Sequence, residues 1–372
     1  MKVGILSMQR IFNYGSFLQA YGLKCLLEQA GCQVEFADYT PGPCLIAGES
    51  RNGLMRKVSK VLEVLRYRAP LAEKLRFIRY KKNYAVNYFP YLGITDQLNL
   101  DPETDLLVIG SDEVFNCVQS NANVGFTPAL FGQGSRAKRR ISYAASFGNT
   151  TLQKLQQYDA AETVGNWLKE LDAISVRDAN SCQIVTDLTG QAPLCHLDPV
   201  LAYDFMGQCD AIPERVPEKD YMILYGYSGR FTREECKQIR AYVRERGLKI
   251  LCIGGVQDAC DRFVDCSPFE VIAYFKNAAC VVTDTFHGTI LSVITQRPFV
   301  SLVRQAGYGN AQKLTDLLSR LGLSHRQLNH MTQLQELFAQ PLDYGPVMTI
   351  LEQQRQNTKQ YLQEQIALCQ NP

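Results

Sequence analysis

The segment TDTFHGT, residues 283–289, places one of only four histidines between a phenylalanine and a glycine. It follows the apolar run AACVVT and precedes the apolar stretch ILSVITQRPFVSLV, which predicts a buried strand that ends just before a helix begins. An imidazole has an ordinary pKa of about 6.5, so His287 at such a strand end is suited to acid/base catalysis. The helix start, with Thr285, Gly288 and Thr289, would offer N–H groups to an anion such as phosphate.

Arg177 is a second candidate, because it lies with Asp178 at the end of the apolar segment DAISVRD. An arginine there could bind a carboxylate or phosphate through two parallel hydrogen bonds, or pair with Asp178 or another acid. The sequence leaves these two interpretations equally open. Asp198 ends a further predicted strand, in CHLDPV, and we expect a structural hinge role for it.

Polar residues also follow two predicted strands in the N-terminal half. Asn13, Tyr14 and Gln19 come after the first strand at a predicted helix start, and Asp112 and Asn116 follow the strand DLLVIGS. Such side chains could hydrogen-bond to sugar hydroxyls. The first helix start lacks both GxGxxG and the P-loop lysine, so a dinucleotide or Walker-type phosphate site is not favoured.

Strands and helices that alternate along the chain must position these residues. The alternation is typical of doubly wound parallel sheets, in which ligands bind outside the carboxyl ends of the strands. It breaks at residues 199–220, which contain three prolines. We therefore predict an α/β fold of two Rossmann-like domains facing a cleft: an N-terminal domain (1–200), a linker (199–220), a C-terminal domain (221–345) and a final helix (346–372).

A basic helical insertion, residues 44–95, interrupts the alternation in the N-terminal domain. Within it, residues 51–83 are rich in Lys and Arg, have only Glu63 and Glu73 as acids, and are divided by Pro70 into two helical pieces. Two interpretations are open. The amphipathic helices could rest on an anionic membrane surface, or they could pack on the first domain with a solvated basic face.

Composition narrows the classes of function. The 372 residues carry a net charge of +2, too small to imply a nucleic-acid partner. The N-terminus lacks a signal-peptide core and no apolar run is long enough to span a membrane, so we expect a cytoplasmic protein. The 13 cysteines form no CxxC and no cluster with histidine, which favours reduced thiols and no metal site.

Six segments, in this order and spacing, resemble the polysaccharide pyruvyl transferase family over about residues 1–330: NYGSFLQAYGL, GSDEVFN, SYAASFG, SVRD, LDPV and TDTFHGT. The resemblance implies a GT-B-like fold and transfer of the enolpyruvyl group of phosphoenolpyruvate to a sugar of a surface polysaccharide, forming a pyruvate ketal without a further cofactor. It implies acid/base or phosphate-binding work for His287 and an anion clamp for Arg177. The C-terminal domain would bind the donor and the N-terminal domain the acceptor.

One position departs from the best-known branch of that family, which has an RLHG pattern. Thr285 stands where that branch has an arginine, and the chain is similar to a branch with a DSFHGT-like motif. Arg304 and Lys313, after the next predicted strand, are candidate replacements for the missing cation, and Arg230 is a weaker one. A lipid-linked acceptor would favour the membrane interpretation, with the protein on the inner face of the plasma membrane.

Two other functions stay open. The same architecture serves sugar-nucleotide-dependent glycosyltransferases, because a fold does not determine a reaction. The change at Thr285 is also compatible with a catalytically idle glycan-binding relative.

Overall fold

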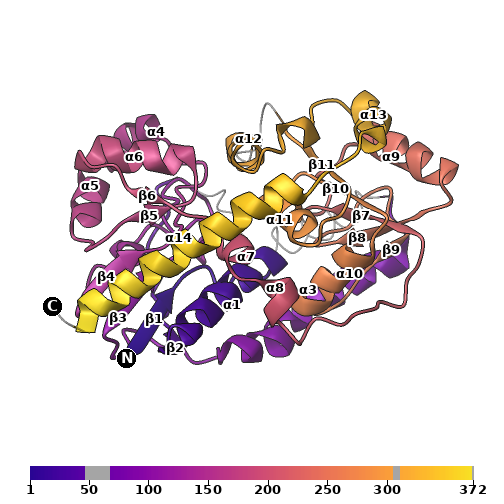
Figure 1. The fold of residues 1–372 in the computed structure, drawn as a ribbon. Helices are drawn as coiled ribbons and strands as arrows, with labels where there is room; N and C mark the ends of the chain where they lie inside the picture. Colours follow the sequence, from indigo (N-terminus) through magenta and orange to yellow (C-terminus); the bar gives the residue numbers. More distant parts are fainter. Residues whose placement is uncertain (47–67, 305–310, 371–372) are drawn as a thin grey trace, which may run out of the picture.

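The computed structural model describes residues 1–46, 68–304 and 311–370. Its N-terminal domain is built on a parallel four-stranded sheet in the order β2-β1-β3-β4 (Figure 1). Isolated bridges join Ile141 to Ala173 and Ala145 to Val176, and they connect β4 to a parallel pair, β5-β6. The strands are β1 (Lys2–Leu6), β2 (Gln33–Phe36), β3 (Leu106–Ile109), β4 (Arg139–Ser142), β5 (Ser175–Val176) and β6 (Leu194–Cys195).

Helices pack on the faces of this sheet, and the burial of the inner strand β3 reflects this packing. All four residues of β3, LLVI, are buried, as expected for a parallel strand that is covered on both faces. The helices of this domain are α1 (Tyr14–Gln29), η2 (Pro128–Phe131), α4 (Leu152–Gln157), α5 (Ala161–Lys169) and α6 (Ala179–Thr189).

The C-terminal domain has a six-stranded parallel sheet in the order β12-β11-β10-β7-β8-β9. Capping boxes at Thr232/Glu235 and Ser267/Glu270 fix where α9 and α10 begin. The strands are β7 (Tyr221–Tyr225), β8 (Lys249–Ile253), β9 (Arg262–Phe263), β10 (Cys280–Thr283), β11 (Phe299–Leu302) and β12 (Gln327–Leu328). The helices are α9 (Arg233–Glu245), α10 (Pro268–Asn277), α11 (Phe286–Ile294), α12 (Ala311–Arg320), η3 (Ser324–Arg326), η4 (Met331–Gln333) and α13 (Leu334–Ala339).

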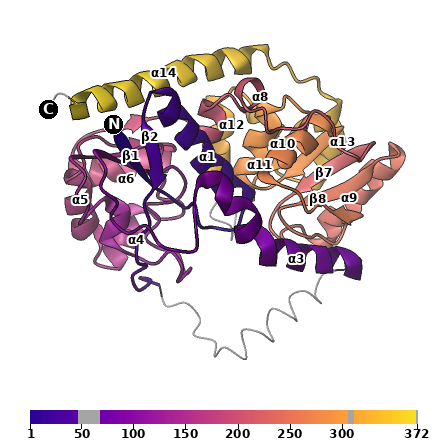
Figure 2. The same cartoon turned by 90° about the horizontal axis from the view of Figure 1, so that it is seen from below.

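The described part of the predicted insertion is a helix, α3 (Leu71–Tyr88), followed by η1 (Phe89–Leu92). Residues 51–67 of the predicted basic stretch lie outside the described residues. Although α3 precedes β3 in the chain, it packs against β9 of the C-terminal domain, where Phe77 meets Phe263 edge to face. Figure 2 shows α3 on the side of the C-terminal domain. The insertion therefore helps to hold the two domains together.

Two further elements connect the domains. The segment between the sheets contains the short helices α7 (Pro199–Ala202) and α8 (Phe205–Gln208). The last helix, α14 (Gly345–Gln370), runs back from the C-terminal domain across the N-terminal domain (Figures 1 and 2). There Tyr361 donates a hydrogen bond to the carbonyl of Ser142 at the end of β4.

Two parallel sheets with helices on their faces confirm the predicted fold class of two Rossmann-like domains. Among the described residues, no helix is both long enough and apolar enough to cross a membrane. The carboxyl ends of β1, β3 and β10 lead directly into the segments that the sequence singled out for chemistry.

Candidate active site between the two domains

His287 lies in the first turn of α11, just after β10. Thr285 caps this helix, because its hydroxyl accepts a hydrogen bond from the N–H of Gly288 at 3.0 Å. A side chain at Gly288 would collide with the hydroxyl of Thr283, 2.1 Å from the new Cβ, and with the ring of Tyr225. The glycine therefore lets the first turn of α11 pack closely on the sheet and so fixes where His287 stands.

The start of α1, from the other domain, faces the imidazole of His287. A Cβ on Gly15 would lie 2.1 Å from Nδ1 of His287, so only glycine leaves room for the ring. Asn13 caps α1 by accepting a hydrogen bond from the N–H of Ser16 at 2.7 Å. Two helix N-termini, one from each domain, thus approach the same place, and both favour negative charge there.

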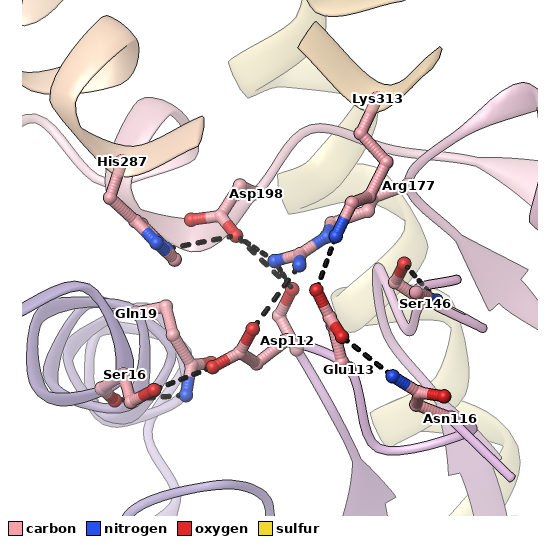
Figure 3. Close-up of polar contacts among 12 residues, drawn as sticks. Ser16, Gln19, Asp112, Glu113, Asn116, Ser146, Arg177, Asp198, His287 and Lys313 are labelled. Atoms are coloured by element: carbon pink, nitrogen blue, oxygen red, sulfur yellow. Dashed lines mark hydrogen bonds and ion pairs between the residues drawn. The ribbon is translucent and has the colours of Figure 1, made fainter. Parts of the chain in front are cut away.

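Arg177 is buried and bridges two carboxylates (Figure 3). Its guanidinium lies 2.6 Å from Asp198 and 3.2 Å from Asp112, and it stacks over the ring of Phe286 at 4.6 Å. Burial opposes its charge, but the nearby carboxylates outweigh burial and raise the pKa of Arg177. Asp178 is not its partner, because that side chain caps α6 through the N–H of Ser181.

Asp112 follows β3 and has a left-handed backbone conformation, with φ of 68°. Non-glycine residues in this conformation are strained and are found disproportionately at functional sites. Its carboxylate also accepts a hydrogen bond from Ser16 at 2.6 Å. Burial disfavours the ionised form, but Arg177, His287 and Ser16 outweigh it and lower the pKa of Asp112. Asp112 is therefore an anion held between the two domains.

Lys313 and Glu113 form an ion pair that crosses the cleft, from α12 to the loop after β3. Lys313 is almost fully buried, whereas Glu113 keeps about a third of its side chain exposed. Burial opposes ionisation of Glu113, but Lys313 prevails and lowers its pKa. Asn116 supports Glu113 by donating a hydrogen bond to the second carboxylate oxygen at 2.8 Å.

Within the part of the chain that the structure describes, Nε2 of His287 has no hydrogen-bond partner, although that atom is buried. The carboxylate of Asp198 lies 3.8 Å from Nε2. Burial lowers the pKa of His287, and the attraction of Asp198 and Asp112 only partly offsets burial. The imidazole is therefore neutral at neutral pH, with a ring nitrogen that is ready to engage a ligand.

These groups line one pocket between the domains. Its walls are formed by Asn13, Tyr14, Ser16, Asp112, Glu113, Arg177, Tyr225, Gly226, Tyr227, Gly254, Thr285, Phe286, His287 and Lys313. Cations, carboxylates, an imidazole and two helix N-termini therefore meet in one place. Such a site can bind an anion, hold a hydroxyl group and move a proton.

The structure places several predicted residues away from this pocket or in other roles. Tyr14 reaches its edge, but its hydroxyl donates to the carbonyl of Cys266 in the other domain. Gln19 is buried below the pocket and donates to Ser7 and Ser16. Thr289 hydrogen-bonds to Ser301 inside the C-terminal domain.

Three further predicted side chains, those of Asn116, Arg304 and Arg230, lie outside the pocket walls. Asn116 acts behind Glu113. Arg304 binds Glu235 at 2.8 Å and shares Asp284 with Arg230. Of the three candidate replacement cations, Lys313 is the one that lines the pocket.

Sequence reasoning missed two acids of this site. Glu113 stands next to Asp112 in GSDEVFN, and its position after β3 was available as a signal. Asp198 was expected at a hinge, and it does cap α7 in the connecting segment through the N–H of Val200. Its second oxygen, however, holds Arg177 and faces His287. No motif in the sequence signals the approach of Asp198 to His287 across the cleft.

The fold and this pocket define a two-domain α/β protein with its site between the domains. A family model described as polysaccharide pyruvyl transferase matches residues 13–305. The chain belongs to this family and is a transferase. No curated protein matches the chain with significance.

Several solved structures are similar to this chain at low identity, with TM-scores below 0.5. UGT89C1 of Arabidopsis thaliana, complexed with UDP, is 9% identical over 98% of this chain and 99% of its own, with a TM-score of 0.49. A putative UDP-N-acetylglucosamine 2-epimerase from Listeria monocytogenes is 11% identical over 91% of this chain and 88% of its own, with a TM-score of 0.46. These likenesses are too distant to indicate a substrate.

Proposed function

We propose that the protein transfers the enolpyruvyl group of phosphoenolpyruvate to a sugar and closes it into a pyruvate ketal. The convergence of His287, Arg177 and Lys313 on one pocket, together with the starts of α1 and α11, supports this proposal. Phosphoenolpyruvate carries a phosphate and a carboxylate, and both suit helix N-termini and cations. Membership of the family supports the same donor.

In the proposed reaction, His287 in its protonated form gives a proton to the methylene carbon of the donor. The adjoining carbon becomes electron-poor, and a sugar hydroxyl attacks it and forms the first C–O bond. The hydroxyl proton returns to the now neutral imidazole. A second hydroxyl of the same sugar then forms the other C–O bond, while the bond to phosphate breaks and the phosphate carries away that hydroxyl's proton.

Thr285 stands where the best-known branch of the family has an arginine, and Lys313 is our candidate for the cation that replaces this arginine. It lines the pocket, and its partner Glu113 is partly exposed, so a phosphate could replace Glu113 beside it. Arg177 is a weaker candidate for direct phosphate binding, because its guanidinium is already held by Asp198 and Asp112. We propose that Arg177 instead positions Asp198 beside His287.

We propose that the acceptor enters through a larger groove on the N-terminal domain. This groove shares Asn13 and Tyr227 with the pocket and contains the loop after β1. Phe12 and Tyr227 are 41% and 51% exposed there, and exposed aromatic rings suit the apolar faces of sugars. The acceptor in this proposal is a nascent or lipid-linked glycan at the inner face of the plasma membrane.

Ligand-induced stabilisation tests the donor. A ligand at 100 times its Kd adds about 2.7 kcal/mol to the free energy of unfolding, and this raises the Tm by several degrees. Phosphoenolpyruvate should raise the Tm of the wild type by this amount and that of Lys313→Gln by much less. The control variant Lys359→Gln, at an exposed position, should show the same rise as the wild type.

Other ligands separate the alternatives in the same assay. Stabilisation by UDP- or GDP-sugars but not by phosphoenolpyruvate would favour a glycosyltransferase. Stabilisation by glycans alone would favour an idle glycan-binding protein. Either outcome would contradict the proposed donor.

A further inference from the structure

The outer face of α3 exposes large apolar side chains to solvent. Leu71, Leu75, Ile78 and Val86 are 65%, 56%, 45% and 77% exposed. At about 100° per residue, these four positions fall on one side of the helix, within an arc of roughly 80°. Exposed apolar residues are common singly, but a contiguous stripe of this kind marks an interaction surface.

Cations accompany this stripe, and α3 itself contributes no acid to it. Arg79 and Lys82 are exposed on the same side of the helix, and Arg76 lies at its margin with half of its side chain exposed. The one acid of α3 is Glu73, which is buried on the opposite side and accepts a hydrogen bond from the N–H of Phe263 at 2.8 Å. The residues that α3 itself exposes on this side are therefore apolar or cationic. Asp265, which is exposed after β9, lies close enough to Arg79 for the two charges to attract each other.

The opposite side of α3 fixes the helix firmly to the protein. Tyr80 and Phe77 pack edge to face on Phe263 of β9. Tyr84 is fully buried and donates a hydrogen bond to the carbonyl of Asn13 at 2.7 Å. Because these contacts hold the helix, the apolar stripe belongs to a surface of the folded protein. Figure 2 shows α3 at the side of the C-terminal domain.

We infer that the outer face of α3, formed by Leu71, Leu75, Ile78, Arg79, Lys82 and Val86, binds an anionic lipid surface. A helix that exposes apolar side chains together with several cations has the pattern of helices that lie in a membrane interface. The excess of positive charge on this helix face complements anionic headgroups, whereas a neutral lipid surface offers these cations no partner. The proposed lipid contact does not depend on which donor the protein uses, and it goes beyond the catalytic proposal.

The position of α3 gives this contact a purpose if the proposed function is correct. Lys81 and Ala85, on the same helix, line the groove that we propose for the acceptor. A lipid surface bound to α3 would therefore lie beside the groove. A glycan carried by a membrane lipid could enter there without leaving the bilayer.

Co-sedimentation of the full chain with vesicles tests the inference. Vesicles of phosphatidylcholine containing phosphatidylglycerol should bind the protein, and pure phosphatidylcholine should not. The double variant Arg79→Gln/Lys82→Gln should lower the partition coefficient between vesicles and water about 25-fold, because each cation contributes about fivefold. Leu75→Ser with Ile78→Ser should lower it by about tenfold or more.

Matched changes elsewhere serve as controls. Leu368→Ser on α14 and Lys237→Gln on α9 alter residues that are similarly exposed and should bind lipid as the wild type does. Unchanged melting temperatures would exclude misfolding as the cause of any loss. Lipid binding at the wild-type level by both α3 double variants would overturn the inference. The inference would also be overturned if these variants bound lipid normally but no longer self-associated. The vesicles contain neither glycan nor phosphoenolpyruvate, so the result is independent of the proposed reaction.

Discussion

Gly15 of the N-terminal domain lies directly against the imidazole of His287 in the C-terminal domain. The space that a Cβ on Gly15 would need is already filled by Nδ1, 2.1 Å away. The catalytic candidate is thus fixed by both domains: α11 carries it, and the first turn of α1 limits where its ring can stand. Its position depends on how closely the domains approach each other.

Gly15→Ala should therefore displace the ring of His287 or push the domains apart. Overpacking of this kind costs about 1–3 kcal/mol of folding free energy. A misplaced catalytic group can lower kcat about 100-fold. Urea denaturation and steady-state kinetics measure the two effects.

A double variant separates positioning from general damage. In Gly15→Ala/His287→Ala the methyl group has room, so stability should recover relative to Gly15→Ala, whereas activity is lost because the imidazole is gone. If Gly15→Ala is fully active, the close contact does not govern the position of His287.

Removing one partner of the buried pair formed by Arg177 and Asp198 should be strongly destabilising, because the other charge is left buried without its partner. Arg177→Met leaves Asp198 without its partner at 2.6 Å, and breaking a buried ion pair costs about 3–5 kcal/mol. Chemical denaturation measures this cost, and adding Asp198→Asn should recover part of it.

The exposed pair of Arg136 and Asp101 provides the comparison. It has a similar distance, also 2.6 Å, but 64% and 38% of the side chains are exposed, so Arg136→Met should cost at most about 1 kcal/mol. Equal costs at the two sites would contradict the structural role of Arg177.

Donor binding should be accompanied by proton uptake at His287. Burial lowers the pKa of this residue below its usual value, so the free protein holds it neutral at pH 7.5. A bound anion beside the ring would raise the pKa of His287 in the complex above its value in the free protein. The affinity for phosphoenolpyruvate should therefore increase as pH falls between these two pKa values. Below the latter pKa this contribution becomes constant.

Calorimetry in buffers of different ionisation enthalpy measures the protons taken up. His287→Gln serves as the matched variant, because any proton taken up by the donor phosphate is common to both proteins. The same uptake in wild type and variant would show that His287 does not gain the proton.

The sequence predicted much of the fold because the strands repeat a local pattern. Apolar runs such as LLVI of β3 and CVVT of β10, each followed by polar residues, indicated both the parallel sheets and the strand ends that carry Asp112 and His287. The helix start at Thr285 was visible for the same reason. Local periodicity is sufficient to predict these features.

Pairings between distant segments could not be predicted in this way. Lys313 and Glu113 are 200 residues apart, and their ion pair depends on how the two domains approach each other. Tyr14 was expected to bind an acceptor, yet its hydroxyl lies against Cys266 because α1 packs on α10. The packing of α3 on the C-terminal domain has the same origin, since no local pattern specifies which surface an amphipathic helix will cover.

The most direct test of the proposed function is product formation. Purified protein is incubated with phosphoenolpyruvate and a panel of surface glycans, free and lipid-linked, and both phosphate and glycan mass are measured. The proposal predicts that phosphate release requires a glycan and that the glycan gains the mass of a pyruvate ketal. His287→Ala should abolish both while retaining the wild-type melting profile. Ketal formation at a normal rate by His287→Ala, or transfer of a sugar from a nucleotide donor with no ketal formed, would contradict it.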